Sequence, residues 1–125
     1  MRRYQRIRKN IQKLISVNPT YITVTRKTGV TDGAGGYTYS TTELNPIKVR
    51  LHGRKVMTVV SNDGGKFDSI RAKLMCDWCA NLKRYNQLNE DTFLIGTDKY
   101  RVLDLKEFWE DGFTVSKEAE VEIID

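Results

Sequence analysis

The pattern of apolar and polar residues over the last third of the chain, from Thr92 to Ile124, predicts a short strand, a tight turn at Gly96–Lys99, a long strand, a turn at Asp111-Gly112 and a second long strand. In the final stretch the apolar positions share one face: Phe113, Val115, Ala119, Val121 and Ile123, with Lys117 as the only break. The opposite face carries Thr114, Ser116, Glu118, Glu120 and Glu122. This alternation predicts a strand that is buried on one side. Asp111-Gly112 lies between two such runs and predicts a hairpin, because both residues tolerate the positive φ of primed turns.

The first 18 residues follow a different period. Apolar side chains recur there at spacings of three and four, at Tyr4, Ile7, Ile11, Leu14 and Ile15. This pattern predicts a basic amphipathic helix over residues 1–18, which Asn18-Pro19 ends. The remaining arc is basic, with Arg2, Arg3, Arg6, Arg8, Lys9 and Lys13. Two interpretations stay open: a helix docked on the sheet with a solvated basic face, or a basic face that meets an acidic partner or phosphate.

The sequence pattern over residues 19–52 predicts the first strands. Thr20–Lys27, Tyr37–Thr42 and Ile47–His52 are β-branched or alternating, with turn residues between them. The Gly-rich segment 30–36 leads into a strand-like run rather than a helix and lacks the Lys-Ser/Thr of a phosphate-binding loop. We therefore interpret it as a hairpin loop.

Residues 53–75 predict a projecting hairpin or loop, with Asn62-Asp63-Gly64-Gly65 at its turn. The pattern over residues 67–81, which overlaps the end of this region, fits either a strand or a helix. The segment carries five basic residues, Arg54, Lys55, Lys66, Arg71 and Lys73. Residues 76–125 complete the sheet with the closing strands. Together these elements predict one mainly β domain, a small antiparallel barrel or sandwich with an N-terminal α-helix.

Charge is distributed unevenly along the 125 residues, although the net charge is only +5. Residues 1–17 hold six basic residues and no acid, and residues 18–89 hold 11 basic and 5 acidic residues. Residues 90–125 reverse the sign, with 4 basic and 11 acidic residues. Such polarity suits a nucleic-acid neighbour or head-to-tail contact between copies.

Candidate chemistry is sparse. The lone pair Cys76 and Cys79 makes neither a disulfide framework nor a four-ligand zinc site, and it is consistent with a reducing cytoplasm. His52, the only histidine, alternates with apolar residues as a strand-surface position does. We expect no metal, no cofactor and no enzymatic activity. No apolar run reaches the roughly 20 residues of a membrane helix, and the basic N-terminus lacks the apolar core of a signal peptide.

Several features follow one another in an informative order: the basic helix, a strand after Asn18-Pro19, the Thr31–Gly36 loop, a Pro-Ile-x-Val-Arg strand at Pro46–Arg50 and a hairpin-like insert. Glu90–Val102 then has Asp-x-Phe followed by Gly-x-x-x-Tyr-x-Val. This order resembles the small head-completion (head-closure, or head–tail connector) proteins of tailed bacteriophages and related prophages. The resemblance implies a ring, commonly of twelve copies, beneath the portal protein, which extends or closes the DNA channel.

The resemblance also implies partners and sites. The portal would bind one side of the ring and the tail or a tail-joining protein the other, within a virion assembled in the bacterial cytoplasm. Arg54, Lys55, Lys66, Arg71 and Lys73 would line the channel and touch packaged DNA transiently and without sequence preference. The contact between copies or partners would join Arg3, Arg6, Lys9 and Lys13 to Glu118, Glu120 and Glu122.

Two other functions are compatible with the sequence. An OB-like barrel that binds single-stranded nucleic acid would need aromatic residues interleaved with basic ones, for which Tyr21, Tyr37 and Tyr39 are candidates. Another neck or tail-terminator component of a phage would share the same fold class and charge pattern.

Overall fold

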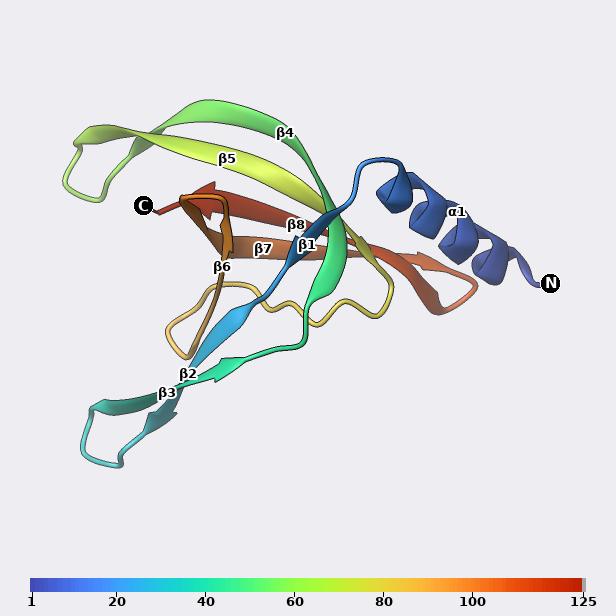
Figure 1. Cartoon of the computed structure of the whole chain (residues 1–125). Helices are drawn as coiled ribbons and strands as arrows, with labels where there is room; N and C mark the ends of the chain where they lie inside the picture. The colour runs from blue at the N-terminus through green and yellow to red at the C-terminus, as the bar shows by residue number, and fades with distance from the viewer. Residues whose placement is uncertain (125) are drawn as a thin grey trace.

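One antiparallel sheet of eight strands, accompanied by a single N-terminal helix, makes up the fold in a computed structural model that describes residues 1–124 (Figure 1). The elements are α1 (Arg3–Val17), β1 (Thr20–Ile22), β2 (Thr25–Thr31), β3 (Tyr37–Glu43), β4 (Ile47–Val60), β5 (Lys66–Asp77), β6 (Asn89–Ile95), β7 (Asp98–Glu110) and β8 (Phe113–Ile123). The strand order is β1-β4-β5-β8-β7-β6-β2-β3. The prediction of a mainly β fold with an N-terminal helix is confirmed.

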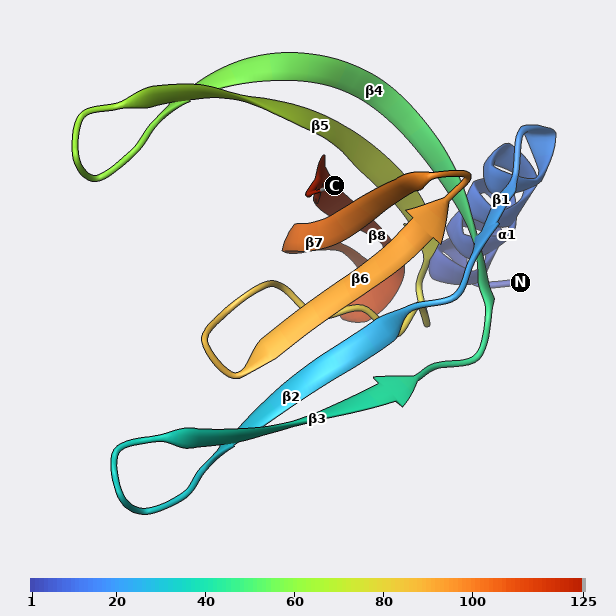
Figure 2. The ribbon, with the colours of Figure 1, turned by 60° about the vertical axis from the view of Figure 1, so that its left-hand side comes forward.

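The sheet curls round because β1, at one end of the strand order, and β2, next to the other end, are consecutive in the chain. β1 pairs with β4, and β2 pairs with β6 and β3. Only Thr23 and Val24 separate β1 from β2, so the strand order returns to where it began and the sheet curls into a barrel-like form (Figure 2). The single strand predicted over Thr20–Lys27 is therefore wrong. The chain bends where it changes partners, and the backbone carbonyl of Val24 accepts a bond from Leu44 N at 2.8 Å.

The core fills the inside of this curled sheet with inward-facing side chains from β1, β4, β5, β7 and β8. The closing strand contributes Val115, Ala119 and Val121, all at most 5% exposed, as its alternation predicted. The predicted turn at Asp111-Gly112 is confirmed, with φ of 51° and 81° at its two residues. Phe93 and Tyr100, adjacent on β6 and β7, stack with ring centroids 5.3 Å apart.

A buried ion pair spans the seam where β2 meets β6. Arg26 lies directly opposite Asp91, which has no exposed surface, and Arg26 Nε and Nη2 donate to its two carboxylate oxygens at 2.8 and 2.9 Å. The same guanidinium donates to the side chain of Asn81, and Asp91 also accepts the backbone N–H of Lys83 at 2.8 Å. The hydrogen bonds to Asp91 raise the pKa of Arg26 more than its burial lowers it.

These bonds hold the segment 78–88, which forms neither helix nor strand, against one end of the barrel. Ala80 and Leu82 are buried there, 6% and 5% exposed, and belong to the core. Lys117 of β8 also holds this segment: its Nζ donates to the carbonyl of Ala80 at 3.0 Å. The sequence predicted a polar connector over Asn81–Asn89, and the structure shows that Leu82 of this connector also belongs to the core.

β4 and β5 form a long hairpin that contains residues 53–75 and extends beyond the barrel (Figures 1 and 2). Over residues 67–81, where a strand or a helix was possible, the chain is strand as far as Asp77. A bulge interrupts the pairing between His52 and Lys55, where Gly53 has a φ of +67°. The bulge reverses the alternation of β4, so that Val56, opposite Ile70, lies on the face that Leu51 occupies before it.

Helix α1 packs beside the starts of β4 and β8 through a small contact. Ile15 is its only buried residue, and Tyr4 stacks on Phe113 with centroids 4.0 Å apart. Leu14, predicted on the apolar stripe, is 44% exposed, so that assignment is wrong. Arg8 takes part in the docking instead: its guanidinium lies 3.9 Å from the centroid of Trp78, and its Nε donates to the carbonyl of Thr114.

Replacing Asp91 with Asn should lower the free energy of unfolding by about 3–5 kcal/mol, because it leaves the Arg26 charge buried without its counter-ion. Urea denaturation followed by circular dichroism measures this loss. The matched control is Asp98→Asn, which removes an exposed partner of Arg54 at 3.8 Å and should cost at most about 1 kcal/mol. Equal losses in the two variants would show that the buried pair does not hold the seam.

Candidate functional site

The predicted acidic surface and part of the predicted channel lining lie side by side on the outside of the barrel. Glu118, Glu120 and Glu122 stand on β8, directly opposite Met75, Lys73 and Arg71 of β5. Diagonal ion pairs join Arg71 to Glu120 at 3.1 Å and Lys73 to Glu118 at 3.6 Å. The two predicted sites thus form one surface, the β5–β8 charge ladder.

Arg101 of β7 extends this ladder on its other side. Its guanidinium pairs with Glu122 and, at 3.2 Å, with Glu90. Burial lowers the pKa of Arg101, but the hydrogen bonds to Glu122 and Glu90 outweigh that effect and the pKa is raised. The carboxylates of the ladder are therefore largely compensated inside the chain. An assembly contact through Glu118, Glu120 and Glu122 stays a prediction, and it would have to compete with these internal pairs.

The five basic residues predicted for the DNA channel do not share one face. Arg71 and Lys73 belong to the ladder, and Arg54, in the bulge, pairs with Asp98. Lys55 and Lys66 are exposed, and neither makes an ion pair within residues 1–124. Lys55 lies opposite Arg71, whereas Lys66 lies opposite Val60 near the tip. Contact of the whole set with DNA stays a prediction.

The projecting part of the hairpin exposes apolar side chains on both faces, which sequence reasoning missed. Val56 and Val60 share one face and are 64% and 62% exposed. Phe67, opposite Val59, lies on the other face and is 52% exposed. The turn is closed by its own bonds: Ser61 N donates to Gly65 O at 2.7 Å, and Asp63 accepts from Ser61 Oγ and Gly65 N. These bonds lower the pKa of Asp63.

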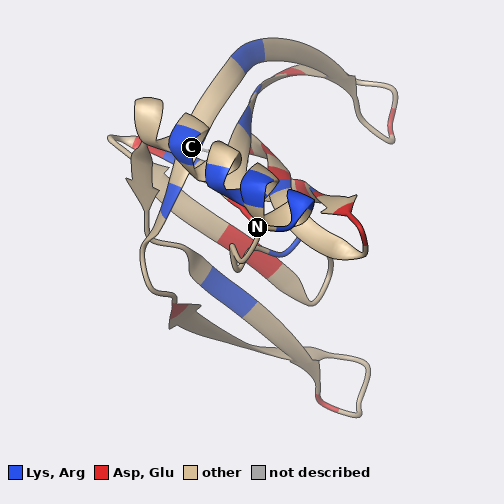
Figure 3. Cartoon of the chain, turned by 90° about the vertical axis from the view of Figure 1, so that its right-hand side faces the viewer, with Lys and Arg blue, Asp and Glu red and all other residues tan. Residues whose placement is uncertain are grey.

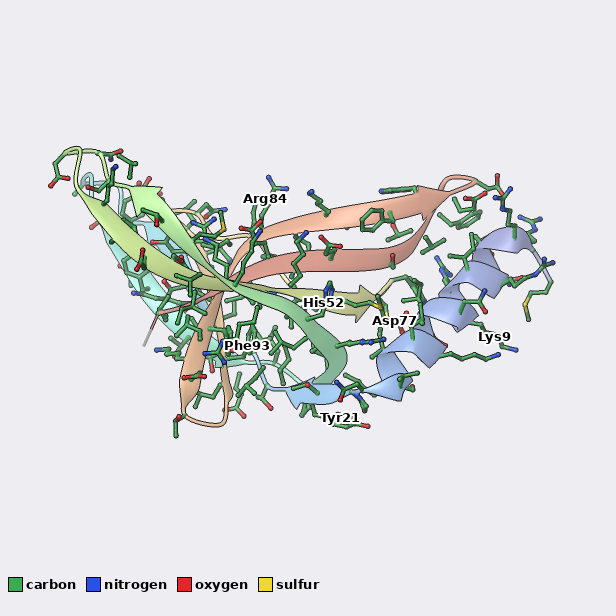
Figure 4. The ribbon with its side chains drawn as sticks, turned by 90° about the horizontal axis from the view of Figure 1, so that it is seen from above. Lys9, Tyr21, His52, Asp77, Arg84 and Phe93 are labelled. Atoms are coloured by element: carbon green, nitrogen blue, oxygen red, sulfur yellow. The ribbon has the colours of Figure 1, made fainter. Side chains whose placement is uncertain are left out.

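Lys and Arg residues recur along α1 (Figure 3), and the side chain of Lys9 points away from the barrel (Figure 4). Of the predicted interface residues, Arg3 pairs with Glu110 at 3.2 Å. Arg6, Lys9 and Lys13 are exposed. A groove of about 630 Å³ runs between the helix and the start of β4, and its polar lining includes Lys9, Lys13, Lys48 and Asp77.

The tyrosines considered for single-stranded nucleic acid are divided between two places. Tyr21 is 69% exposed on β1, while Tyr37 and Tyr39 stand together on β3. Lys27 Nζ lies 4.6 Å from the ring centroid of Tyr39. A cleft of about 190 Å³ separates Tyr39 from Tyr85, an aromatic residue of the connector that the sequence did not single out. Nothing in the sequence indicated this position, because the connector has no regular alternation of apolar and polar residues from which the position of Tyr85 could be predicted.

The remaining candidate residues are positioned as follows. The Gly-rich segment is the loop of the β2–β3 hairpin, where Asp32 Oδ1 accepts from Ala34 N and Gly36 N at 2.8 and 3.1 Å. His52 is exposed and lies opposite Lys73. Within residues 1–124, no three His, Cys, Asp or Glu side chains gather as metal ligands would. The same part of the chain contains no helix with the length and apolarity that crossing a membrane requires.

No protein-family model matches the chain, and no curated protein matches its sequence.

The two cysteines should differ sharply in reactivity. Burial raises the pKa of Cys76 to about 12, whereas Cys79 is exposed in the turn after β5. Since the thiolate is the reactive species, the native protein should react rapidly with one equivalent of DTNB and the denatured protein with two. Cys79→Ser should abolish the rapid phase and Cys76→Ser should retain it. Rapid reaction of both thiols in the native protein would contradict the burial of Cys76.

Proposed function

We propose that the chain is a head-completion protein of a tailed bacteriophage or prophage, a structural component that forms a ring under the portal and extends or closes the DNA channel. A barrel with an N-terminal helix and a long insert between its strands is the architecture that the resemblance of the Asn18–Arg50 and Glu90–Val102 segments implies. The role is mechanical and requires neither catalysis nor a cofactor.

The observation that carries the proposal is the β4–β5 hairpin. Outside the barrel it exposes Val56 and Val60 on one face and Phe67 on the other, which is unfavourable in water unless another surface covers them. Its tip is fixed by hydrogen bonds within the Ser61–Gly65 turn. A preformed apolar hairpin suits insertion between neighbouring subunits or into a partner such as the portal or a tail-joining protein.

The ion pairs of the hairpin reduce the number of cations that it could offer to DNA. Arg71 and Lys73 are compensated by Glu120 and Glu118, so they add little net positive charge. Lys55 and Lys66 are left as the cations available for passing phosphates. A lining of low net charge suits a channel, because strong attraction would retard the DNA that must move through it.

A shortened hairpin tests the proposal. Met57 pairs directly with Ser69, so replacing residues 58–68 with Asn-Gly closes a two-residue turn without touching the barrel. We expect an unchanged melting temperature within a few degrees and, in the phage or prophage that encodes the chain, DNA-filled heads without attached tails. Electron microscopy of lysates and titres of infectious particles measure the effect.

The matched control shortens the other hairpin. Thr31 pairs with Tyr37, so residues 32–36 can also be replaced by Asn-Gly, and this variant should assemble normally. Normal tailed particles from the β4–β5 variant would remove the role of the hairpin. Normal particles after deletion of the whole gene would remove the proposed function itself.

A further inference from the structure

Four cationic side chains form a line along α1, which we call the α1 stripe: Arg2, Arg6, Lys9 and Lys13. At 3.6 residues per turn their positions fall within about 60° of one another around the helix axis, over a length of about 16 Å. The side chains that dock the helix, including Tyr4 and Ile15, lie on the opposite arc. Figure 4 shows Lys9 pointing away from the barrel.

The stripe has no counter-charge in the part of the chain that the structure describes. α1 contains no acidic residue, and none of the four cations makes an ion pair within residues 1–124. The two acids nearest to the helix bond to other residues than the stripe: Glu110 pairs with Arg3, and Asp77 accepts from Gln12 at 3.1 Å and from the backbone of Trp78. On the barrel, by contrast, the cations of the β5–β8 charge ladder are paired.

Two residues of β4 extend the positive surface beyond the helix. Lys48 Nζ donates to Ser16 Oγ at 2.7 Å, and Arg50 Nη1 donates to the carbonyl of Leu14 at 3.2 Å. Lys48 also lines the groove beside Lys9 and Lys13. Cationic side chains therefore continue from the helix to the first residues of β4, and Asp77 is the acid among the residues that line the groove between them.

The stripe does not stabilise the helix that carries it. The first turn holds no acidic residue, and cations near a helix N-terminus oppose the macrodipole. Arg8 is the basic residue that helps to hold α1 in place, because it lies against Trp78 and bonds to Thr114. The docking thus fixes the orientation in which the stripe faces outward, while the stripe remains available for a ligand.

We propose that the α1 stripe binds the phosphodiester backbone of duplex DNA without reading its sequence. Duplex DNA carries one negative charge per about 1.7 Å of its axis, so a line of cations about 16 Å long can reach several phosphates. A protein partner is a poorer fit, since the centre of a typical protein interface is apolar and no apolar side chain interrupts the stripe. The inference does not rest on the connector role.

Fluorescence anisotropy with a labelled 20-base-pair duplex of arbitrary sequence tests the proposal between 50 and 200 mM NaCl. Four phosphate contacts predict a slope of about −3.6 for the logarithm of the association constant against the logarithm of salt concentration. The variant R2Q/R6Q/K9Q/K13Q should reduce this slope towards zero and weaken binding at 50 mM NaCl at least tenfold. Its helix content and melting temperature should be unchanged, because Gln is a good helix former.

The matched control is K83Q/R84Q/K99Q/K106Q, which removes the same number of exposed charges from the connector and from β7 and should leave the slope unchanged. An equal loss in this control would show that net charge alone drives binding and would overturn the assignment. Failure of the native chain to bind the duplex at 50 mM NaCl would also overturn it. So would tighter binding to phosphatidylserine vesicles or to polyglutamate, which would indicate a membrane surface or an acidic protein. No phage particle enters the assay, so its outcome is separate from the test of the proposed function.

Discussion

The ion pair between Arg26 and Asp91 lies where β2 pairs with β6, and this pairing joins the β2–β3 hairpin to the rest of the sheet. The two residues are directly opposed across β2 and β6, and Asp91 is fully buried. Removing two charges from water is costly, and their attraction offsets that cost only when the geometry is good and every polar atom is satisfied. Here both carboxylate oxygens accept from Arg26, and Lys83 N and Asn89 Nδ2 provide further donors. Arg26 and Asp91 also bond to Asn81 and Lys83, so the same group of side chains holds both the β2–β6 pairing and the connector.

The electrostatics of the chain follow from strand pairing. The acidic block from Glu90 onward and the basic block before it occupy neighbouring strands, and ion pairs across β5, β8 and β7 compensate most of that charge. On the helix, by contrast, Arg3 pairs with Glu110, but Arg6, Lys9 and Lys13 make no ion pair within residues 1–124. Most of the net charge of +5 is therefore concentrated on α1 and the start of β4, although the sequence distributes positive charge over its first two thirds.

Local periodicity was sufficient wherever one face of a strand is buried along its whole length. β8 comes close to such a strand: its alternation predicted the burial of Val115, Ala119 and Val121 and the turn before it. Phe113, predicted on the buried face, is 40% exposed, and Ser116, predicted on the polar face, is buried, so those two assignments are wrong. The bend at Thr23 and Val24 could not be predicted, because it arises from a change of partner between strands distant in sequence. The bulge at Gly53 reverses which side chains share a face, and only the register with β5 reveals that. For the same reason the pairing of Arg71 with Glu120 was invisible: 49 residues separate them.

The role of Arg8 shows why the sequence pattern of α1 placed two side chains wrongly, Arg8 on the solvated basic face and Leu14 on the buried stripe. All six basic residues of α1 and its N-cap look equivalent in the sequence, yet one lies flat against Trp78 while Leu14, an apolar residue, is exposed. A guanidinium can replace an apolar side chain in such a contact because its planar face stacks on aromatic rings while its N–H groups bond at the edge. Arg8 thus shares the docking side of the helix with Tyr4 and Ile15, and Arg2, Arg6, Lys9 and Lys13 lie on the opposite arc.

Strand β4 places the two candidate surfaces far apart on one rigid element. Lys48 lies beside the helix at its start, and Val60 lies near the hairpin tip at its end. At about 3.3 Å per residue, roughly 40 Å of strand separates them. A polyanion on α1 and a protein partner on the apolar hairpin would therefore not compete for space (Figure 1). Since β4 pairs with β5 along its length and with β1 at its base, the distance between the two surfaces is set by the sheet itself.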